Sequence, residues 1–166
     1  MSTATAQQLP VPIPDFPGRV DVEVVVPVVA EPPVAFAAMT QWNEQGRWML
    51  GSKVWVSRGS GREPGDELTA WTGLGRVGFV DTMTVTAATD AMVVVEHTGR
   101  VVRGYGWMGI DPSDGRTRFV WGEAVRPPLG VLGRVGWVVV GPALRLAVRY
   151  SLRTLARLVE TGALPR

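Results

Sequence analysis

Hydrophobic and polar residues alternate along most of the chain before residue 126, and the pattern becomes helical near the end. Alternation with a period of two is typical of β-strands that bury one face, and Val and Thr dominate the alternating segments. Strands are therefore predicted over residues 19–29, 53–58, 67–72, 79–86, 91–98, 101–110 and 116–125. The connections between the last six are short and turn-like, which favours an antiparallel meander.

Between the first two predicted strands, residues 31–50 have a helical pattern. Pro32 and Pro33 open it, and large apolar side chains recur at helical spacing as far as Trp48. Gly46 interrupts the pattern, so we expect two short helices joined at an angle. Trp42 and Trp48 are expected to pack these helices onto the sheet.

The longest helix is predicted over residues 130–161. From Pro142 onward, apolar or small residues recur every three or four positions and form one face. This face comprises Leu144, Ala147, Val148, Ser151, Leu152, Leu155, Leu158 and Val159. A second face carries Arg145, Arg149, Arg153 and Arg157. We expect the apolar face to be buried and the Arg face to contact water, with Gly162 ending the helix.

Two sequence features bear on the continuity and the location of this predicted helix. Gly141-Pro142 predicts a break or kink between a first apolar piece, residues 132–140, and the main helix. Residues 135–144 are apolar throughout, but Arg134 and Arg145 bound this run at about half the roughly 20 residues that a membrane span requires. A buried core helix is therefore favoured over a membrane span.

Composition indicates a single globular domain. The chain has 166 residues, of which 46% are hydrophobic and 19% charged, enough for a substantial core. Residues 1–18 carry several prolines in alternation with apolar residues and are expected to form a flexible leader before a domain over residues 19–162. The N-terminus has neither a basic n-region nor an apolar h-region, so a cytoplasmic location is expected.

The same composition argues against several kinds of site. The chain has no Cys and one His, which disfavours a disulfide framework and a Cys- or His-based metal site. It has no Gly-rich phosphate loop, so no cofactor is expected. Its net charge is only +2, and no aromatic residues interleave with the Arg face of the last helix, so nucleic-acid binding is not expected.

The order of strand, two short helices, six strands and long helix resembles the START-like, or helix-grip (SRPBCC), superfamily. This superfamily includes polyketide cyclase/dehydrase-type lipid-binding proteins. The resemblance is carried by that order and by the segments QWNEQGRWML, GFVDTMTVT, EHTGRVVRGYGW and RFVWGEAVRPPLGVLGRVGW, which look most like small bacterial members. It implies an α+β fold in which a curved antiparallel seven-stranded sheet wraps around the C-terminal helix and leaves a cavity for an apolar small molecule. Members include carriers, aromatase/cyclases and co-chaperones, so the fold alone does not select a function.

Turn lengths predict which side chains face that cavity. If Gly99-Arg100 is a two-residue hairpin turn, Glu96 faces Arg103 on the solvent side and His97 faces inward opposite Val102. If Ile110 lies opposite Thr117, the next hairpin places Trp121 opposite Gly106 and Glu123 opposite Gly104. The two hairpins agree on one inner face, made of Val102, Gly104, Gly106, Met108, Phe119, Trp121 and Glu123, with Val93 and Val95 beside His97.

The alternation of residues 79–86 turns Asp81 inward, where strand pairing can place it opposite His97. Three polar groups, Asp81, His97 and Glu123, are then expected in an otherwise apolar cavity, and they are the candidate catalytic residues. The expected ligand contacts are Met83, Val95, His97, Gly104, Gly106, Met108, Phe119, Trp121, Glu123 and Trp137. A slip of one residue would reverse every assignment of face.

These residues leave three functions open. The leading prediction is binding of a hydrophobic small molecule, such as a lipid or polyketide-like compound, without catalysis. The alternative is a polyketide cyclase or dehydratase, because a carboxylate beside an imidazole suits a general base. A third is a protein-partner module that uses the Arg helix face or the aromatics Trp55, Trp71 and Trp107. The sequence leaves monomer and homodimer open.

Overall fold

The computed structural model describes residues 10–128 and 130–164, apart from the side chain of residue 74. It contains seven strands, two α-helices and two short 3-10 helices. In chain order they are β1 (Val20–Val28), α1 (Pro32–Met39), η1 (Trp42–Arg47), β2 (Ser52–Arg58), β3 (Glu67–Leu74), β4 (Val77–Ala88), β5 (Met92–His97), β6 (Arg103–Asp111), η2 (Ser113–Gly115), β7 (Thr117–Arg126) and α2 (Val131–Glu160).

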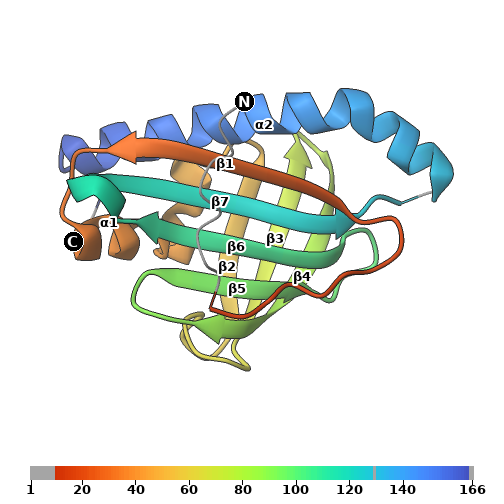
Figure 1. Ribbon diagram of the computed structural model, residues 1–166, viewed down its shortest axis with the longest axis horizontal. Coiled ribbons are helices and arrows are strands. Elements are labelled where there is room, and N and C mark those ends of the chain that lie inside the picture. Colours follow the sequence, from red (N-terminus) through yellow and green to blue (C-terminus); the bar gives the residue numbers. More distant parts are fainter. Residues whose placement is uncertain (1–9, 129, 165–166) are drawn as a thin grey trace.

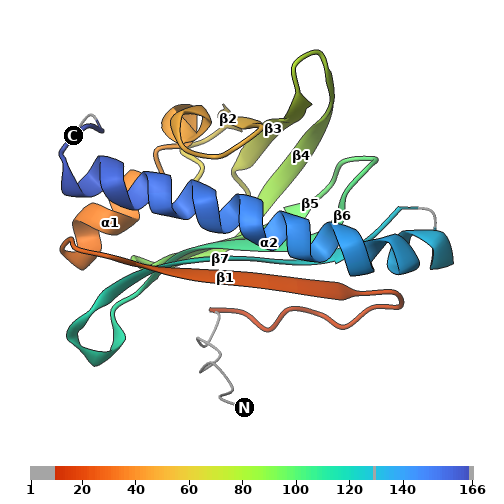
Figure 2. The ribbon, with the colours of Figure 1, turned by 90° about the horizontal axis from the view of Figure 1, so that it is seen from above.

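The strands form one antiparallel sheet in the order β1-β7-β6-β5-β4-β3-β2, so the last six are a meander and β1 is added beside β7 (Figure 1). Figure 2 shows α2 lying along this sheet, with β1 on one side and β2–β4 on the other. The predicted helix-grip fold, with its short helices after the first strand, is confirmed.

The two predicted faces of the long helix are confirmed in its C-terminal half. Leu152 and Leu155 are fully buried in the core between α2 and the sheet, and Val148 is nearly so. Arg149 and Arg153 are exposed on the opposite side. Burial of the apolar face stabilises the fold because neither a bare sheet face nor a bare apolar helix is stable in water.

Of the break or kink expected at Gly141-Pro142, the break is wrong, because α2 is a single helix of 30 residues that contains Pro142. The proline has no N–H to donate to the carbonyl four residues earlier, at Val138. Both residues are exposed, so water can satisfy that carbonyl. The helix bends in its N-terminal part instead of ending (Figure 1).

The junction between the short helices also differs from the prediction. Gly46 lies inside η1, and the chain changes direction at Thr40 and Gln41. The Thr40 hydroxyl donates to the Phe36 carbonyl at 2.8 Å, and this bond closes the last turn of α1. Trp42 and Trp48 are buried in the core, as expected.

A second hydrophobic cluster covers the outer face of the sheet. Its buried members are Ala87, Met92, Val94, Trp107, Val120 and Ala124. Val11 and Ile13 pack against it, so the expected leader is not wholly separate from the fold. From the sequence, Trp107 was not assigned to a face of the sheet. It lies in this outer cluster, and its Nε1–H donates to Glu23 Oε2 at 3.1 Å. Trp55 is 41% exposed and Trp71 is half-buried.

Candidate ligand-binding site

A cavity of about 180 Å³ lies between the inner face of the sheet, η1 and α2. The sheet contributes most of the wall, and α2 contributes Leu144, Ala147, Val148 and Ser151. Apolar side chains form most of this wall, and its titratable groups, Asp81, His97 and Glu123, lie together on β4, β5 and β7. The arrangement matches the usual anatomy of a small-molecule site, which is apolar with a few converging polar groups.

The predicted ligand contacts fall into two groups. Those that line the cavity are Met83, Val95, His97, Gly106, Met108, Trp121 and Glu123. The others, Gly104, Phe119 and Trp137, are not part of the wall. Phe119 is fully buried in the core, and Gly104 lies so close to β7 that a Cβ would come within 2.2 Å of the Ala124 carbonyl. Trp137 packs against the core near Gly141.

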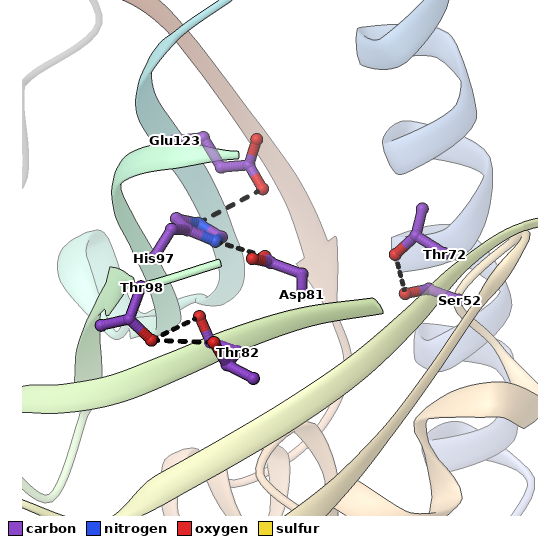
Figure 3. Close-up of polar contacts among 7 residues, drawn as sticks. All are labelled: Ser52, Thr72, Asp81, Thr82, His97, Thr98 and Glu123. Atoms are coloured by element: carbon purple, nitrogen blue, oxygen red, sulfur yellow. Dashed lines mark hydrogen bonds and ion pairs between the residues drawn. The ribbon is translucent and has the colours of Figure 1, made fainter. Parts of the chain in front are cut away.

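Sequence reasoning missed the part of the wall that η1, the segment after it, β2 and β3 supply. These residues are Trp42, Gln45, Met49, Leu50, Ser52, Val54, Leu68, Ala70 and Thr72. A signal was available for the strands, because Ser52 and Val54, and likewise Leu68 and Ala70, follow the period of two that marks one face. Ser52 and Thr72 are joined by a hydrogen bond of 3.1 Å (Figure 3).

Three strands bring the candidate polar residues together as predicted (Figure 3). His97 Nδ1 lies 2.6 Å from Asp81 Oδ2, and His97 Nε2 lies 3.9 Å from Glu123 Oε1. Asp81 and His97 are 5% and 7% exposed, so their contact is shielded from water. Within the described part of the chain, His97 Nε2 and Asp81 Oδ1 are buried without a hydrogen-bond partner.

The pairings that produce this cluster differ from the predicted ones by two residues. His97 lies opposite Met83 and Gly104, not Asp81 and Val102, and Asp81 reaches the ring diagonally. The loop between β5 and β6 is longer than a two-residue turn, which accounts for the offset from Val102 to Gly104. Between β4 and β5 the register shifts at Val85 and Ala87. Because an offset of two conserves the face of every strand residue, the inward set within the strands was still correct.

Because of the same offset, several predicted cross-strand pairs are wrong. Glu96 lies opposite Tyr105, so the expected pairing with Arg103 is wrong. In the next hairpin, Gly106 lies opposite Glu123, and Ile110 lies opposite Phe119 rather than Thr117. Trp121 consequently lies opposite Met108 instead of covering Gly106.

Two glycines leave room for the polar cluster. A Cβ on Gly106 would approach His97 Nε2 to 3.2 Å, which is a tight contact, and one on Gly99 would approach Asp81 Oδ1 to 2.5 Å. Next to Gly99, Thr98 donates its backbone N–H to the Thr82 carbonyl at 2.8 Å, and the two threonine hydroxyls are 2.9 Å apart (Figure 3). These contacts hold the end of β5 against β4 and so fix His97 beside Asp81.

The electrostatics of the cluster favour bound protons. Burial alone would lower the pKa of His97, but the Asp81 hydrogen bond and the negative charges of Glu123 and Asp81 outweigh it, so the pKa is raised. Burial raises the pKa of Glu123, and Asp81 adds to that effect while His97 opposes it. The Asp81 contact presents Nε2 to the cavity, where it accepts a proton when the ring is neutral and donates one when the ring is charged.

Among the described residues, no group of three His, Cys, Asp or Glu side chains is arranged to hold a metal ion. The chemistry that the cluster itself can supply is hydrogen bonding and proton transfer at His97 Nε2 and Glu123. Both groups face the same cavity, so a single bound molecule can contact them together.

Comparison with known proteins gives a family match over almost the whole chain. The family model described as "Polyketide cyclase / dehydrase and lipid transport" matches residues 19–160. No match was found among curated proteins.

Solved structures share the fold at low sequence identity. The Zhui aromatase/cyclase from Streptomyces sp. R1128 has a TM-score of 0.69 at 12% identity, over 88% of this chain and 96% of its own. The protein TTHA0849 from Thermus thermophilus has a TM-score of 0.64 at 14% identity, over 88% and 99%. Ginseng major latex-like protein 151 from Panax ginseng has a TM-score of 0.63 at 9% identity, over 89% and 99%. Identities this low show a common fold and leave the function to the site.

Proposed function

Because the chain belongs to the polyketide cyclase/dehydrase and lipid-transport family, we propose that it binds a hydrophobic small molecule in the cavity between the sheet and α2. The observation that supports this most directly is the combination of apolar walls with one buried polar cluster. Apolar walls supply affinity through burial of ligand surface, and a few fixed polar groups orient the ligand.

The size of the cavity narrows the class of ligand. Its volume of about 180 Å³ is close to the roughly 150 Å³ of an engineered apolar cavity that holds benzene. A compact ring compound of one or two rings fits this space, whereas an extended acyl chain would need the walls to move apart. The proposed ligand is therefore a ring compound of polyketide-like character.

The polar cluster defines what the ring must carry. His97 Nε2 is buried and has no hydrogen-bond partner among the described residues, and leaving such an atom unpaired is costly. A hydroxyl on the ligand satisfies the neutral imidazole, and a carbonyl satisfies the charged one. Glu123 lies close enough to His97 to contact the same group.

Calorimetric titration with 2-naphthol tests the proposal, because this compound has two fused rings and one hydroxyl. We expect about micromolar affinity, and about tenfold weaker binding of naphthalene, which lacks the hydroxyl. Val95→Phe, which adds a ring inside the cavity, should abolish binding, whereas Val80→Phe on the exposed side of β4 should not. Failure of 2-naphthol to bind, or binding that Val95→Phe leaves unchanged, would contradict the proposal.

The Asp81–His97 contact favours a second candidate function, proton abstraction next to a carbonyl. Asp81 orients the ring through Nδ1, and the basic Nε2 atom faces the cavity. In such a step, Nε2 takes the α-proton of a ketone, the C–H bond breaks, and the electron pair moves to the carbonyl oxygen to give an enolate. Cyclisation and dehydration of polyketides both use such steps.

Exchange of the α-protons of 2-tetralone in D₂O, followed by NMR, separates catalysis from binding alone. If His97 is a general base, the wild-type protein accelerates exchange and His97→Gln lowers the rate by about 10²–10⁴-fold while the affinity for 2-tetralone changes little. If the protein only binds its ligand, exchange proceeds at the same rate with and without it. Glu96→Gln, on the outer face beside His97, is the matched control.

A further inference from the structure

The N-terminal half of α2 exposes apolar side chains that the fold leaves uncovered. Those exposed by half or more are Val131, Leu132, Val135, Val138, Val139, Val140 and Leu146. Singly exposed apolar residues are ordinary on a protein surface, but a contiguous apolar patch marks an interaction site. The expectation of a buried core helix therefore holds only for the C-terminal half.

Helical spacing gathers these residues, except Val140, into a stripe on the outer face of α2. Val131, Val135 and Val139 follow one another every four residues, and Leu146 and Tyr150 continue the same face. The buried face, with Val148, lies on the opposite side of the helix. Helix α2 thus has two apolar faces, of which the sheet covers one, and its first turns extend beyond the sheet (Figures 1 and 2).

The charged residues of α2 before Glu160 are all arginines. Arg134 and Arg145 lie at its edge, Arg149 and Arg153 follow it along the helix, and residues 131–159 contain no acidic residue. Among the described residues, none of the ion pairs involves an arginine of α2. Near the start of the helix, the side chains of Arg126 and Arg134 both come close to Gly18, which adds a second cation to that end.

We propose that this outer face of α2 docks on the surface of an anionic lipid bilayer. The apolar stripe enters the boundary between headgroups and acyl chains, and the flanking arginines meet lipid phosphates. An amphipathic helix lying in the plane of a membrane has the same arrangement, with apolar burial and cationic attraction acting together. The inference rests on the surface of the helix and is independent of the ligand in the cavity.

Two other occupants fit the observations less well. By length and composition α2 is long and apolar enough to cross a membrane, and 11% of its apolar 18-residue stretch is buried. Its C-terminal half, however, carries core residues such as Leu152 and Leu155. A span would remove these residues from the core. A second copy of the chain would bring an arginine row without acidic residues against its own equivalent across a two-fold contact.

Flotation of the purified full-length chain with vesicles tests the proposal. With vesicles of phosphatidylcholine containing about 30% phosphatidylglycerol we expect binding, and with phosphatidylcholine alone we expect at least about tenfold less. The double variant Val135→Gln/Val139→Gln should lose about tenfold or more of the binding and stay folded by circular dichroism. Arg145→Gln/Arg149→Gln should weaken binding to anionic vesicles and reduce its dependence on salt.

The control is a pair of exposed valines elsewhere. Val77 and Val80 lie on β4 and are 81% and 55% exposed, so Val77→Gln/Val80→Gln should bind vesicles like the wild type. The absence of binding to anionic vesicles would overturn the proposal. Equal losses of binding in Val135→Gln/Val139→Gln and Val77→Gln/Val80→Gln would overturn it as well. A lipid-free dimer in light scattering that Val135→Gln/Val139→Gln converts to a monomer would also overturn it, because a second copy would then cover the stripe.

Discussion

Two glycines on neighbouring strands show how the two faces of the sheet differ. On the outer face Gly122 lies opposite Trp107, whose ring fills the space above it, since a Cβ there would meet the ring at 2.2 Å. On the inner face Gly106 lies opposite Glu123, and a Cβ would stop 3.2 Å from His97 Nε2. A large aromatic covers the first glycine and not the second, so the outer face is filled while the inner face keeps a cavity.

Truncating the outer aromatic gives the largest expected effect. Trp107→Ala removes a nearly buried ring from the outer cluster and leaves Glu23 without its hydrogen bond, so we expect a loss of about 3–5 kcal/mol in the free energy of unfolding. Urea denaturation measures this loss. Trp55→Ala, at a 41% exposed position, should cost less than about 1 kcal/mol. Equal losses would show that the outer face is not a packed layer.

Away from the cavity, side chains of α2 fill the space against the inner face of the sheet. A substitution of Leu155 tests this packing. Leu155 is fully buried and does not line the cavity, so Leu155→Ala should lower the free energy of unfolding by about 2–5 kcal/mol. Arg153→Ala, on the exposed side of the same helix, should cost about 0.5 kcal/mol or less. Comparable midpoints for the two variants in urea would contradict the assignment of helix faces.

For β4–β7 the sequence was sufficient to predict which face each candidate residue occupies, and insufficient to predict its partner. Side-chain direction follows from local alternation, so Asp81, His97 and Glu123 were correctly turned inward. Pairing depends on loop length, and the loop between β5 and β6 moved His97 from Val102 to Gly104. The cluster survived because the offset was two residues; an offset of one would have dispersed it.

Other features depend on tertiary contacts that no local pattern contains. Apolar periodicity is the same for a covered and an uncovered helix, so the exposed stripe around Val135 and Val139 could not be told from core. The cover that Val11 and Ile13 provide comes from a distant segment whose prolines indicated only an extended chain. Gly141-Pro142 left a break and a kink open, and the helix continues through Pro142 into its packed C-terminal half.

Substitution of Gly106 on the inner face tests whether the space beside His97 is needed for ligand binding. Gly106→Ala places a methyl group against His97, which must move by a few tenths of an ångström, so we expect a change of about 1 kcal/mol in stability. The affinity for 2-naphthol should fall about tenfold in calorimetry, because the ring nitrogen leaves its position. Gly136→Ala, where a Cβ has no atom within 4 Å, should leave the affinity unchanged. An unaltered affinity in Gly106→Ala would separate His97 from ligand binding.

The smallest expected effect is a loss of stability with rising pH that arises from the inner face. The pKa of His97 is raised in the folded protein, so between its unfolded value of about 6.5 and its folded value the native state binds more protons than the unfolded chain. Its contribution to stability is fully present below about pH 6.5 and is lost as the pH rises through the folded pKa. The raised pKa of Glu123 acts in the same direction at lower pH, starting from an unfolded value of about 4.5.

His97 is the one histidine of the chain, so NMR titration of its ring reports this pKa without ambiguity. We expect a titration midpoint above the ordinary value in the wild type and a lower one in Asp81→Asn, which removes the negative charge beside Nδ1. In urea denaturation, the free energy of unfolding should decrease as the pH rises above about 6.5 in the wild type, and His97→Gln should remove this decrease. Glu96→Gln, on the outer face of the same strand, should leave both measurements unchanged, because its side chain is exposed and points away from the cluster. A midpoint at or below the ordinary value in the wild type would show that burial outweighs the two carboxylates, and the inner face would then hold a neutral imidazole.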